Sequence, residues 1–410
     1  MTGDTNTAIV RDLMAEFAGL TGLDPPRTPL RRYLWTDAYA VCNYLELFRR
    51  TGDGVYRDLA LRLVDQVHHT LGRHRDDDPR TGWISGLPDE EGEAHPTRGG
   101  LRIGKPLPER RPNDLFDERL EWDRDGQYYH YLTKWMHALN RVGRTTGDPA
   151  YVRWAVELAE TAHAAFTCVP SSGGKRMYWK MSIDLSRPLV PSMGRHDPLD
   201  GFVTYSELRA AAGGTDLSAE IAEIARICRG EPLATDDPLG IGALLFDAGR
   251  IVQILDGSGR IVQILEGSGR IVQILDGSGR IAQFSGRRGF AHESLLASVL
   301  DAALSGLARF AGSGTLRSPP DYRLAFRELG LSIGLSIGLR GIGPLAERMR
   351  ENPALSRRAD ALMRYVPLAK TIEQFWMDDT NRKAVTWTQN AEINMVMLAT
   401  SLAPGEFLAV

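Results

Sequence analysis

The sequence predicts an all-α protein assembled from repeated antiparallel helical hairpins. One hairpin is present twice, because the turn Thr51-Gly52-Asp53-x-x-Tyr56 returns 95 positions later as Thr146-Gly147-Asp148-x-x-Tyr151. The apolar positions after the two tyrosines also match, at steps that place one stripe on a 3.6-residue helix. Asp53 and Asp148 suit the N-cap of the helix that follows each turn. Strand-like alternation is almost absent, so repetition of one helix–turn–helix unit defines the fold class.

Apolar periodicity and capping residues predict about twelve helices in chain order. They are expected near 5–20, 33–50, 55–73, 126–144, 149–166, 199–213, 217–229, 240–255, 290–312, 322–340, 343–369 and 389–402. Tight connections at 51–54, 145–148, 214–216 and 341–342 alternate with longer ones, such as 74–125. Because alternate connections of an antiparallel array emerge on opposite faces, we expect the long loops on one face and the tight turns on the other.

This alternation of twelve helices resembles the six-hairpin (α/α)6 toroid, the superfamily of six-hairpin glycosidases and of N-acylglucosamine epimerase-type proteins. The resemblance covers the whole chain and rests on the architecture and the Thr-Gly-Asp-x-x-Tyr turn. It implies one domain over 1–410, with a site at the mouth formed by the long loops. An open helical solenoid is the competing fold, but its repeats would be shorter and more uniform, without such long loops.

A ten-residue unit, Gly-Arg-Ile-Val-Gln-Ile-Leu-Asp-Gly-Ser, recurs nearly unchanged from residue 249 to 283. Such near-identity indicates recent duplication. Either each unit is a short strand with a turn, or the first copy ends the eighth helix and the others are passengers. We expect this insertion, 249–286, between the eighth and ninth helices on the face opposite the site, inert and aggregation-prone. A scaffold or oligomerising role is the alternative. Leu331-Ser-Ile-Gly followed by Leu335-Ser-Ile-Gly indicates a smaller duplication of roughly one helical turn.

The composition excludes several classes of function. Apolar content of 43% and charged content of 25% are ordinary for a soluble protein. A net charge of −3 and a pI near 6.3 give no basic footprint for nucleic acid. The three cysteines, widely spaced, indicate a reducing compartment rather than a disulfide framework. Without a signal-peptide pattern or an apolar run long enough to span a bilayer, we expect a cytoplasmic protein without nucleic-acid or membrane partners. A homo-oligomer stays open.

Tryptophans gather in the long loops and where those loops meet helices. Flat aromatic faces at the mouth of a toroid suit stacking against the apolar C–H patches of sugar rings. The alternative is that large residues pin large loops to the core. The six tryptophans in question are Trp35, Trp83, Trp122, Trp179, Trp376 and Trp387.

The loop 74–125 is rich in residue types that carry chemistry. Gly99-x-x-x-x-Gly104-Lys105 imitates a phosphate-binding loop, but Pro106 replaces the required Ser or Thr and no strand precedes it. Glu121 and Asp125 lead into the fourth helix, where helix capping is their alternative role. On that helix His130, Lys134 and His137 share one face, but a lysine between two histidines argues against a metal site.

Two later loops add candidates. His196-Asp197 beside Asp200 would supply a histidine held by a carboxylate, with helix capping again as the alternative. Asp378 and Asp379 are adjacent carboxylates in an aromatic setting, where the pKa values of two such groups can be pushed apart.

The leading hypothesis is a glycoside hydrolase that uses two carboxylates, without cofactor or metal, on a small-molecule or oligosaccharide substrate. The pair would join Glu121 or Asp125 to Asp200 or Asp378 across the mouth, with His196 and His130 in sugar binding or proton transfer. An anionic sugar group would be held by Arg98, Arg102, Lys105 and Lys180. A sugar epimerase or isomerase that uses the histidines, and a non-catalytic binding or scaffold protein, are the alternatives.

Overall fold

The computed structural model describes residues 2–410 apart from 29, 172, 213–215, 230, 268–286 and 341–351. The main helices are α1 (Thr2–Thr21), α2 (Leu34–Thr51), α3 (Gly54–Leu71), α6 (Tyr129–Thr146), α7 (Pro149–Phe166), α8 (Asp197–Ala211), α9 (Ser218–Cys228), α10 (Pro238–Gly267), α11 (Arg287–Gly312), α12 (Ala325–Arg340), α14 (Pro353–Met363), α15 (Pro367–Met377) and α17 (Ala391–Leu402). Shorter helices are α4 (Asp89–Ala94), α5 (Glu118–Asp123), α16 (Val385–Thr388) and α18 (Gly405–Leu408).

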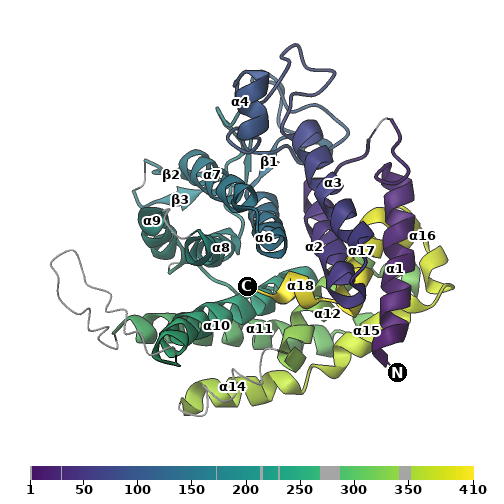
Figure 1. Cartoon of the computed structure of the whole chain (residues 1–410). Coiled ribbons are helices and arrows are strands. Elements are labelled where there is room, and N and C mark those ends of the chain that lie inside the picture. Colours follow the sequence, from purple (N-terminus) through teal and green to yellow (C-terminus); the bar gives the residue numbers. More distant parts are fainter. Residues whose placement is uncertain are drawn as a thin grey trace.

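The described helices form two concentric rings. In the inner ring α2, α6, α8, α10, α12 and α17 each pack on the next, and α17 returns to α2 and closes the circle. Behind them lie α3, α7, α9, α11, α15 and α1, so that the first and last long helices are neighbours (Figure 1). The closed ring predicted from the sequence is confirmed, and the open solenoid is wrong. Ser294–Arg317 is long and apolar enough by composition to cross a membrane, but within it α11 packs on α10 and α14 as an outer helix.

The long connections meet one another around one face of the rings. Each of the six touches the next, either directly or through the first turn of the helix that follows it. This circuit gathers the amino ends of all six inner helices on that face, which we call the loop face. The contacts are Leu34–Ile103, Arg80–Asp184, His196–Leu233, Arg327–Asp237, Val385–Asp321 and Arg31–Glu392.

The duplicated turn has the same hydrogen bonds in both copies. Gly52 and Gly147 end their helices with φ of 72° and 75°, a left-handed conformation that glycine adopts without strain. Asp53 then accepts a hydrogen bond from the backbone N–H of Val55, and Asp148 does the same two residues on. The predicted N-caps are therefore confirmed.

The first copy of the ten-residue unit is helical. Helix α10 continues to Gly267 and so includes most of the second copy as well; the prediction of short strands is wrong for the described part of the repeat, and residues 268–286 lie outside the described residues. The single helix predicted over 343–369 is also wrong. The chain turns at Tyr365 and Val366, and α15 begins at Pro367, which supplies no backbone N–H to continue a helix.

Short strands were missed in the loops beside the site. β1 (Gln127–Tyr128), β4 (Lys180–Met181) and β5 (Pro188–Val190) form one antiparallel sheet in the order β1-β4-β5. β2 (Thr167–Cys168) pairs with β3 (Arg176–Met177). With two or three residues each, they are too short to show alternation in the sequence. The pairing of β1 with β4 joins the loop before α6 to the loop before α8.

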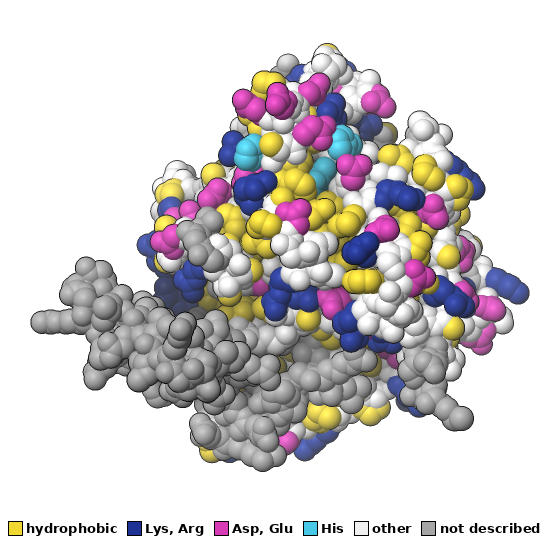
Figure 2. Space-filling model, viewed as in Figure 1, with side chains coloured by type: hydrophobic (Ala, Val, Ile, Leu, Met, Phe, Trp, Pro, Cys, Tyr) yellow, Lys and Arg dark blue, Asp and Glu magenta, His cyan; other side chains and the backbone are white. Residues whose placement is uncertain are grey.

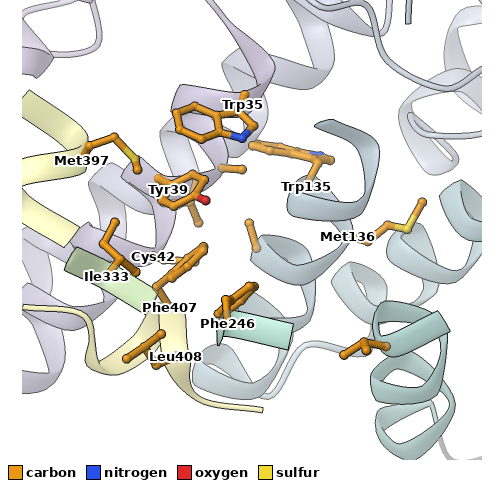
Figure 3. Close-up of a cluster of buried hydrophobic side chains, with 14 of the residues drawn as sticks. Trp35, Tyr39, Cys42, Trp135, Met136, Phe246, Ile333, Met397, Phe407 and Leu408 are labelled. Atoms are coloured by element: carbon orange, nitrogen blue, oxygen red, sulfur yellow. The ribbon is translucent and has the colours of Figure 1, made fainter. Parts of the chain in front are cut away.

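The centre of the inner ring is filled by the C-terminal segment. Phe407 of α18 stacks between Tyr39 of α2 and Phe246 of α10, with ring centroids 4.2 and 4.4 Å apart (Figure 3). Its carbonyl oxygen accepts a hydrogen bond from His137 of α6 at 2.8 Å. Figure 1 shows the C terminus in the middle of the ring. This segment was not predicted, because it is too short to show an apolar periodicity. It fills the space between the inner helices at the centre of the ring.

Candidate active site

Glu121 and Asp125 both form buried ion pairs, with arginines of the loop 74–125 and, for Glu121, with Lys180 of β4. Glu121 lies 2.9 Å from the ammonium of Lys180 and 3.1 Å from Arg110. Asp125 is fully buried, 2.6 Å from Arg102, and accepts backbone N–H groups as well. A buried ion pair between residues of two loops, or of one loop, holds the backbone of that loop in place. We therefore give both carboxylates a structural role and do not place them in the reaction.

The same pairs remove two of the proposed anion-binding cations. Arg102 and Lys180 are buried and neutralised, and the half-exposed Arg98 lies 3.7 Å from Glu157. Lys105 has no carboxylate partner among the described residues, and its ammonium lies 5.3 Å from the centre of the Tyr33 ring. Of the four cations, Lys105 is the one that the described residues leave uncompensated on the loop face.

Four of the six tryptophans are buried. Trp83 and Trp35 pack inside the protein, while Trp376 donates its indole N–H to Glu328 at 2.9 Å and stacks on Trp387. They pin the loops, which is the alternative role that the sequence left open. Trp122 and Trp179 differ, since Trp122 is half exposed and Trp179 is partly exposed. These two remain available to a ligand.

Asp378 and His196 have local roles. Asp378 is exposed and accepts the backbone N–H of Thr380, an ordinary turn contact. His196 donates to the carbonyl oxygen of Leu233 at 2.8 Å and so joins two long loops. Burial lowers the pKa of His196, which keeps its ring neutral.

The two remaining candidates, Asp200 and His130, meet at the loop face between α8 and α6. Both oxygens of Asp200 lie 2.8 Å from the ammonium of Lys134, and the hydroxyl of Thr133 donates to the same carboxylate. Arg250 of α10 adds a contact at 3.2 Å. Three neighbouring helices of the inner ring thus converge on one carboxylate.

Asp197, one helical turn before Asp200, is in the opposite electrostatic state. Burial raises the pKa of Asp197 to about 7, and the negative charge of Asp200 adds to the rise. Its Oδ2 is enclosed without a hydrogen-bond partner. Burial would also raise the pKa of Asp200, but the cations Lys134 and Arg250 outweigh it and lower that pKa. At neutral pH a carboxyl that still keeps its proton about half of the time therefore lies one helical turn from an ionised one.

His130 is the accessible member of this group. Its Nδ1 lies 3.9 Å from Oδ1 of Asp197, and its side chain is 32% exposed. Packing within the protein, and then the charge of Lys134, lower the pKa of His130, so the imidazole is neutral. A ligand that approaches from the loop face meets His130 before it meets either carboxylate.

A second layer of charge lies beneath Asp200 and was missed by sequence reasoning. Arg250 contacts Asp247 at 3.3 Å and Glu207 at 2.6 Å, and burial raises the pKa of Asp247 to about 7. Arg250 belongs to the first copy of the ten-residue unit, so this copy is part of the core. The available signal was an acid and a base three residues apart in an otherwise apolar helix. No group of three or more potential metal-binding side chains occurs among the residues that the structure describes.

Comparison with known proteins identifies the class of fold. No protein-family model matches the sequence, and no curated protein is detectably similar to it. Among solved structures, an α-1,6-mannanase from Salegentibacter sp. HEL1_6 is similar with a TM-score of 0.51 at 10% identity, over 97% of this chain and 99% of that one. The fold is the (α/α)6 toroid. An inactive variant of that mannanase with bound α-1,6-mannotriose gives a TM-score of 0.49 at 10% identity over the same shares. A cellobiose 2-epimerase from Spirochaeta thermophila DSM 6192 gives 0.45 at 14% identity, over 87% of this chain and 85% of that one.

Proposed function

We propose that this protein is a carbohydrate-active enzyme of the glycoside hydrolase type, with Asp197 as the proton donor and Asp200 as its ionised partner. The observation that carries the proposal is a pair of buried carboxyl groups one helical turn apart at the loop face, of which Asp200 is held by Lys134 and Arg250 while Asp197 has a raised pKa and, among the described residues, no cation of its own at that distance. Glycosidases use such a pair, one carboxyl raised in pKa to act as an acid and one kept ionised. The toroid fold that the chain shares with the mannanase supports the assignment to carbohydrates.

The reaction would proceed from the loop face. Asp197 gives its proton to the glycosidic oxygen as the bond to the sugar carbon breaks. The positive charge that develops on the sugar ring is stabilised by Asp200, whose own charge Lys134 and Arg250 hold in place. Water then adds to the sugar carbon, and the proton it loses restores Asp197. In both steps the proton moves between Asp197 and the sugar through the imidazole of His130, which lies 3.9 Å from the carboxyl and is the more exposed of the two side chains.

The test is hydrolysis of α-1,6-mannotriose and of cellobiose, followed by chromatography of the products. We expect Asp197→Asn to lower kcat roughly 100-fold or more, because the amide cannot donate an acidic proton. Activity of the unaltered protein should fall as pH rises through about 7, where Asp197 loses its proton. Asp123→Asn, the same change at an exposed acid at the end of α5, is the matched control. Full activity in a folded Asp197→Asn protein would contradict the assignment.

A sugar epimerase is the second candidate, and His130 is the observation that favours it. A neutral, partly exposed imidazole suits the removal of a proton from a sugar carbon, with Asp197 behind it as a proton store. Incubation of cellobiose in deuterated water, read by NMR, separates the two. Deuterium at a sugar carbon that disappears in His130→Gln would support epimerisation, whereas bond cleavage without deuterium uptake supports hydrolysis. If neither reaction occurs with any sugar tested, the protein is a binding protein on a toroid frame.

A further inference from the structure

An exposed apolar surface lies on the loop before α6, outside the acid–base centre. Trp122 at the end of α5 is 49% exposed, and the neighbouring apolar side chains on this loop are exposed as well. Large apolar side chains that are exposed close together in one loop are a candidate place for a ligand to bind. The other members are Leu115, Phe116 and Leu120.

Trp122 is held rigidly although it is exposed. The side chain of the residue before it, Glu121, forms ion pairs with Lys180 and Arg110. The ammonium of Lys180 also donates a hydrogen bond to the backbone carbonyl oxygen of Glu121 at 2.7 Å. Asp117 caps the start of α5 by accepting two backbone N–H groups. A side chain whose backbone is fixed loses less entropy when it contacts a ligand. The buried pair that the reaction does not need thus orders the loop that presents Trp122.

Aromatic rings connect Trp122 to the acid–base centre in three steps. Trp122 meets Trp179 edge-on with centroids 5.2 Å apart, and Trp179 stacks on Tyr128 at 4.9 Å. Tyr128 stacks in turn on His130 at 5.6 Å, with the rings only 17° from parallel. We call Trp122, Trp179, Tyr128 and His130 the aromatic track. Tyr128 is buried between Trp179 and His130, so it does not contact a ligand itself but fixes the position of Trp122 relative to His130.

We propose that the exposed and partly exposed members of the aromatic track, Trp122, Trp179 and His130, bind an oligosaccharide chain, with its reacting sugar at His130 and Asp197 and a more distant sugar on Trp122. The inference rests on the proposed function and adds to it that the substrate is a chain rather than a monosaccharide. Flat rings recognise the C–H faces of sugars, and their continuity with the acid–base centre favours a chain over a protein that docks on the aliphatic members alone.

The test measures affinity as a function of chain length. Isothermal titration calorimetry would use α-1,6-linked mannose oligomers and β-1,4-linked glucose oligomers, each from the monosaccharide to the hexasaccharide. We expect Trp122→Ala to weaken binding of the longest oligomer that the protein accepts roughly tenfold, because one aromatic contact is lost. Monosaccharide binding should stay unchanged, and Trp122→Phe should restore most of the affinity. Leu115→Ala, the most exposed apolar side chain of the same loop, is the matched control and should bind like the unaltered protein.

The outcomes separate this inference from the function on which it rests. Binding that does not depend on Trp122 at any length would overturn the aromatic track and leave the proposed function standing. No binding or turnover of any oligomer by the unaltered protein would contradict both. Light scattering on the same samples tests whether a second copy of this chain, rather than a sugar chain, binds to this surface. Self-association that both Trp122→Ala and Leu115→Ala abolish would assign the patch to a second copy of this chain and overturn the proposal.

Discussion

A buried carboxyl group with an oxygen that lacks a hydrogen-bond partner costs the folded state free energy when it ionises, and Oδ2 of Asp197 has no such partner among the described residues. Its pKa is about 7 in the folded protein against 3.8 for the free group. As pH rises from about 4 to about 7, the unfolded chain releases this proton while the folded chain keeps it. The contribution of Asp197 to stability therefore falls across this window and is constant above it. The residue proposed to act as the acid therefore lowers the stability of the folded protein at neutral pH, where the unfolded chain carries it ionised.

Replacement of Asp197 by Asn should remove this pH dependence. Relative to the unaltered protein, Asp197→Asn is expected to gain stability as pH rises from 4 to 7, by at most about 4 kcal/mol for a shift of three pKa units. Chemical denaturation at pH 4, 5, 6, 7 and 8 measures the difference between the two proteins. Asp123→Asn, at an exposed acid, should show no such trend. A difference that is the same at every pH would show that Asp197 is ionised in the folded protein.

The sequence located this site better than it assigned the roles within it. His130 and Lys134 were visible because helical spacing places them on one face, and Asp200 because it closely follows His196 and Asp197 in the sequence. Glu121 and Asp125 looked equally suitable, and only tertiary structure shows that Lys180 of the next long loop neutralises Glu121 and that Arg102, 23 residues earlier in the same loop, neutralises Asp125. A sequence read one segment at a time does not reveal which charges are paired across segments. The pKa of a buried carboxyl depends on those pairings, so its role as acid or as structural anion was not predictable.

At the scale of the helix, glycines set how closely α10 and α12 approach. A Cβ atom on Gly242 of α10 would lie 2.1 Å from the backbone oxygen of Gly330, and one on Gly334 of α12 would lie 2.5 Å from the oxygen of Gly242. Backbone contacts backbone here, so no flexible side chain can move aside. Gly334 ends the first Leu-Ser-Ile-Gly copy. The predicted duplication therefore falls in a helix whose glycines form the contact between two inner helices.

Gly242→Ala should destabilise the protein by about 1–3 kcal/mol or more, because an added methyl group must push two inner helices apart. Gly19→Ala is the matched control, since Gly19 lies in helix α1 with no atom within 4 Å of the added Cβ. That change should stabilise the protein by up to about 1 kcal/mol through helix propensity alone. Urea denaturation followed by circular dichroism measures both. An equal effect of the two substitutions would contradict the close approach of α10 and α12.

Elements with long periodic stretches were predicted well, and elements defined by distant partners were not. The helices that flank the Thr-Gly-Asp turns follow from local capping and apolar spacing. Strand β1 pairs with β4 across more than fifty residues, β4 and β5 have only two and three residues, and α18 is only four residues long. Nothing in their own sequences distinguishes them from loop. The ten-residue unit shows the converse, because its β-prone composition yields to the helix α10 that it extends.

At the scale of the whole molecule, a ring of helices has an axis, and the stability of the ring depends on what fills it. Phe407 lies on this axis and contacts side chains from α2, α6 and α10. The adjacent Glu406 lies 2.6 Å from Arg141 of α6, and its backbone N–H donates to Glu46 of α2. The last residues of the chain thus join the first half of the ring to the second. They also support Tyr39 and Phe246, whose rings lie close to Lys134 and Arg250.

Truncation of this plug should therefore weaken the entire ring rather than its end alone. We expect Phe407→Ala to lower the free energy of unfolding by about 3–5 kcal/mol, because a fully packed aromatic leaves a cavity between helices that cannot close on it. Phe116→Ala, the same change at an exposed position, should shift stability by no more than about 0.5 kcal/mol. Hydrogen exchange supplies the decisive readout. Faster exchange in α2, α6 and α10 together would show that the plug couples these helices, whereas faster exchange confined to α18 would show that the ring holds without it.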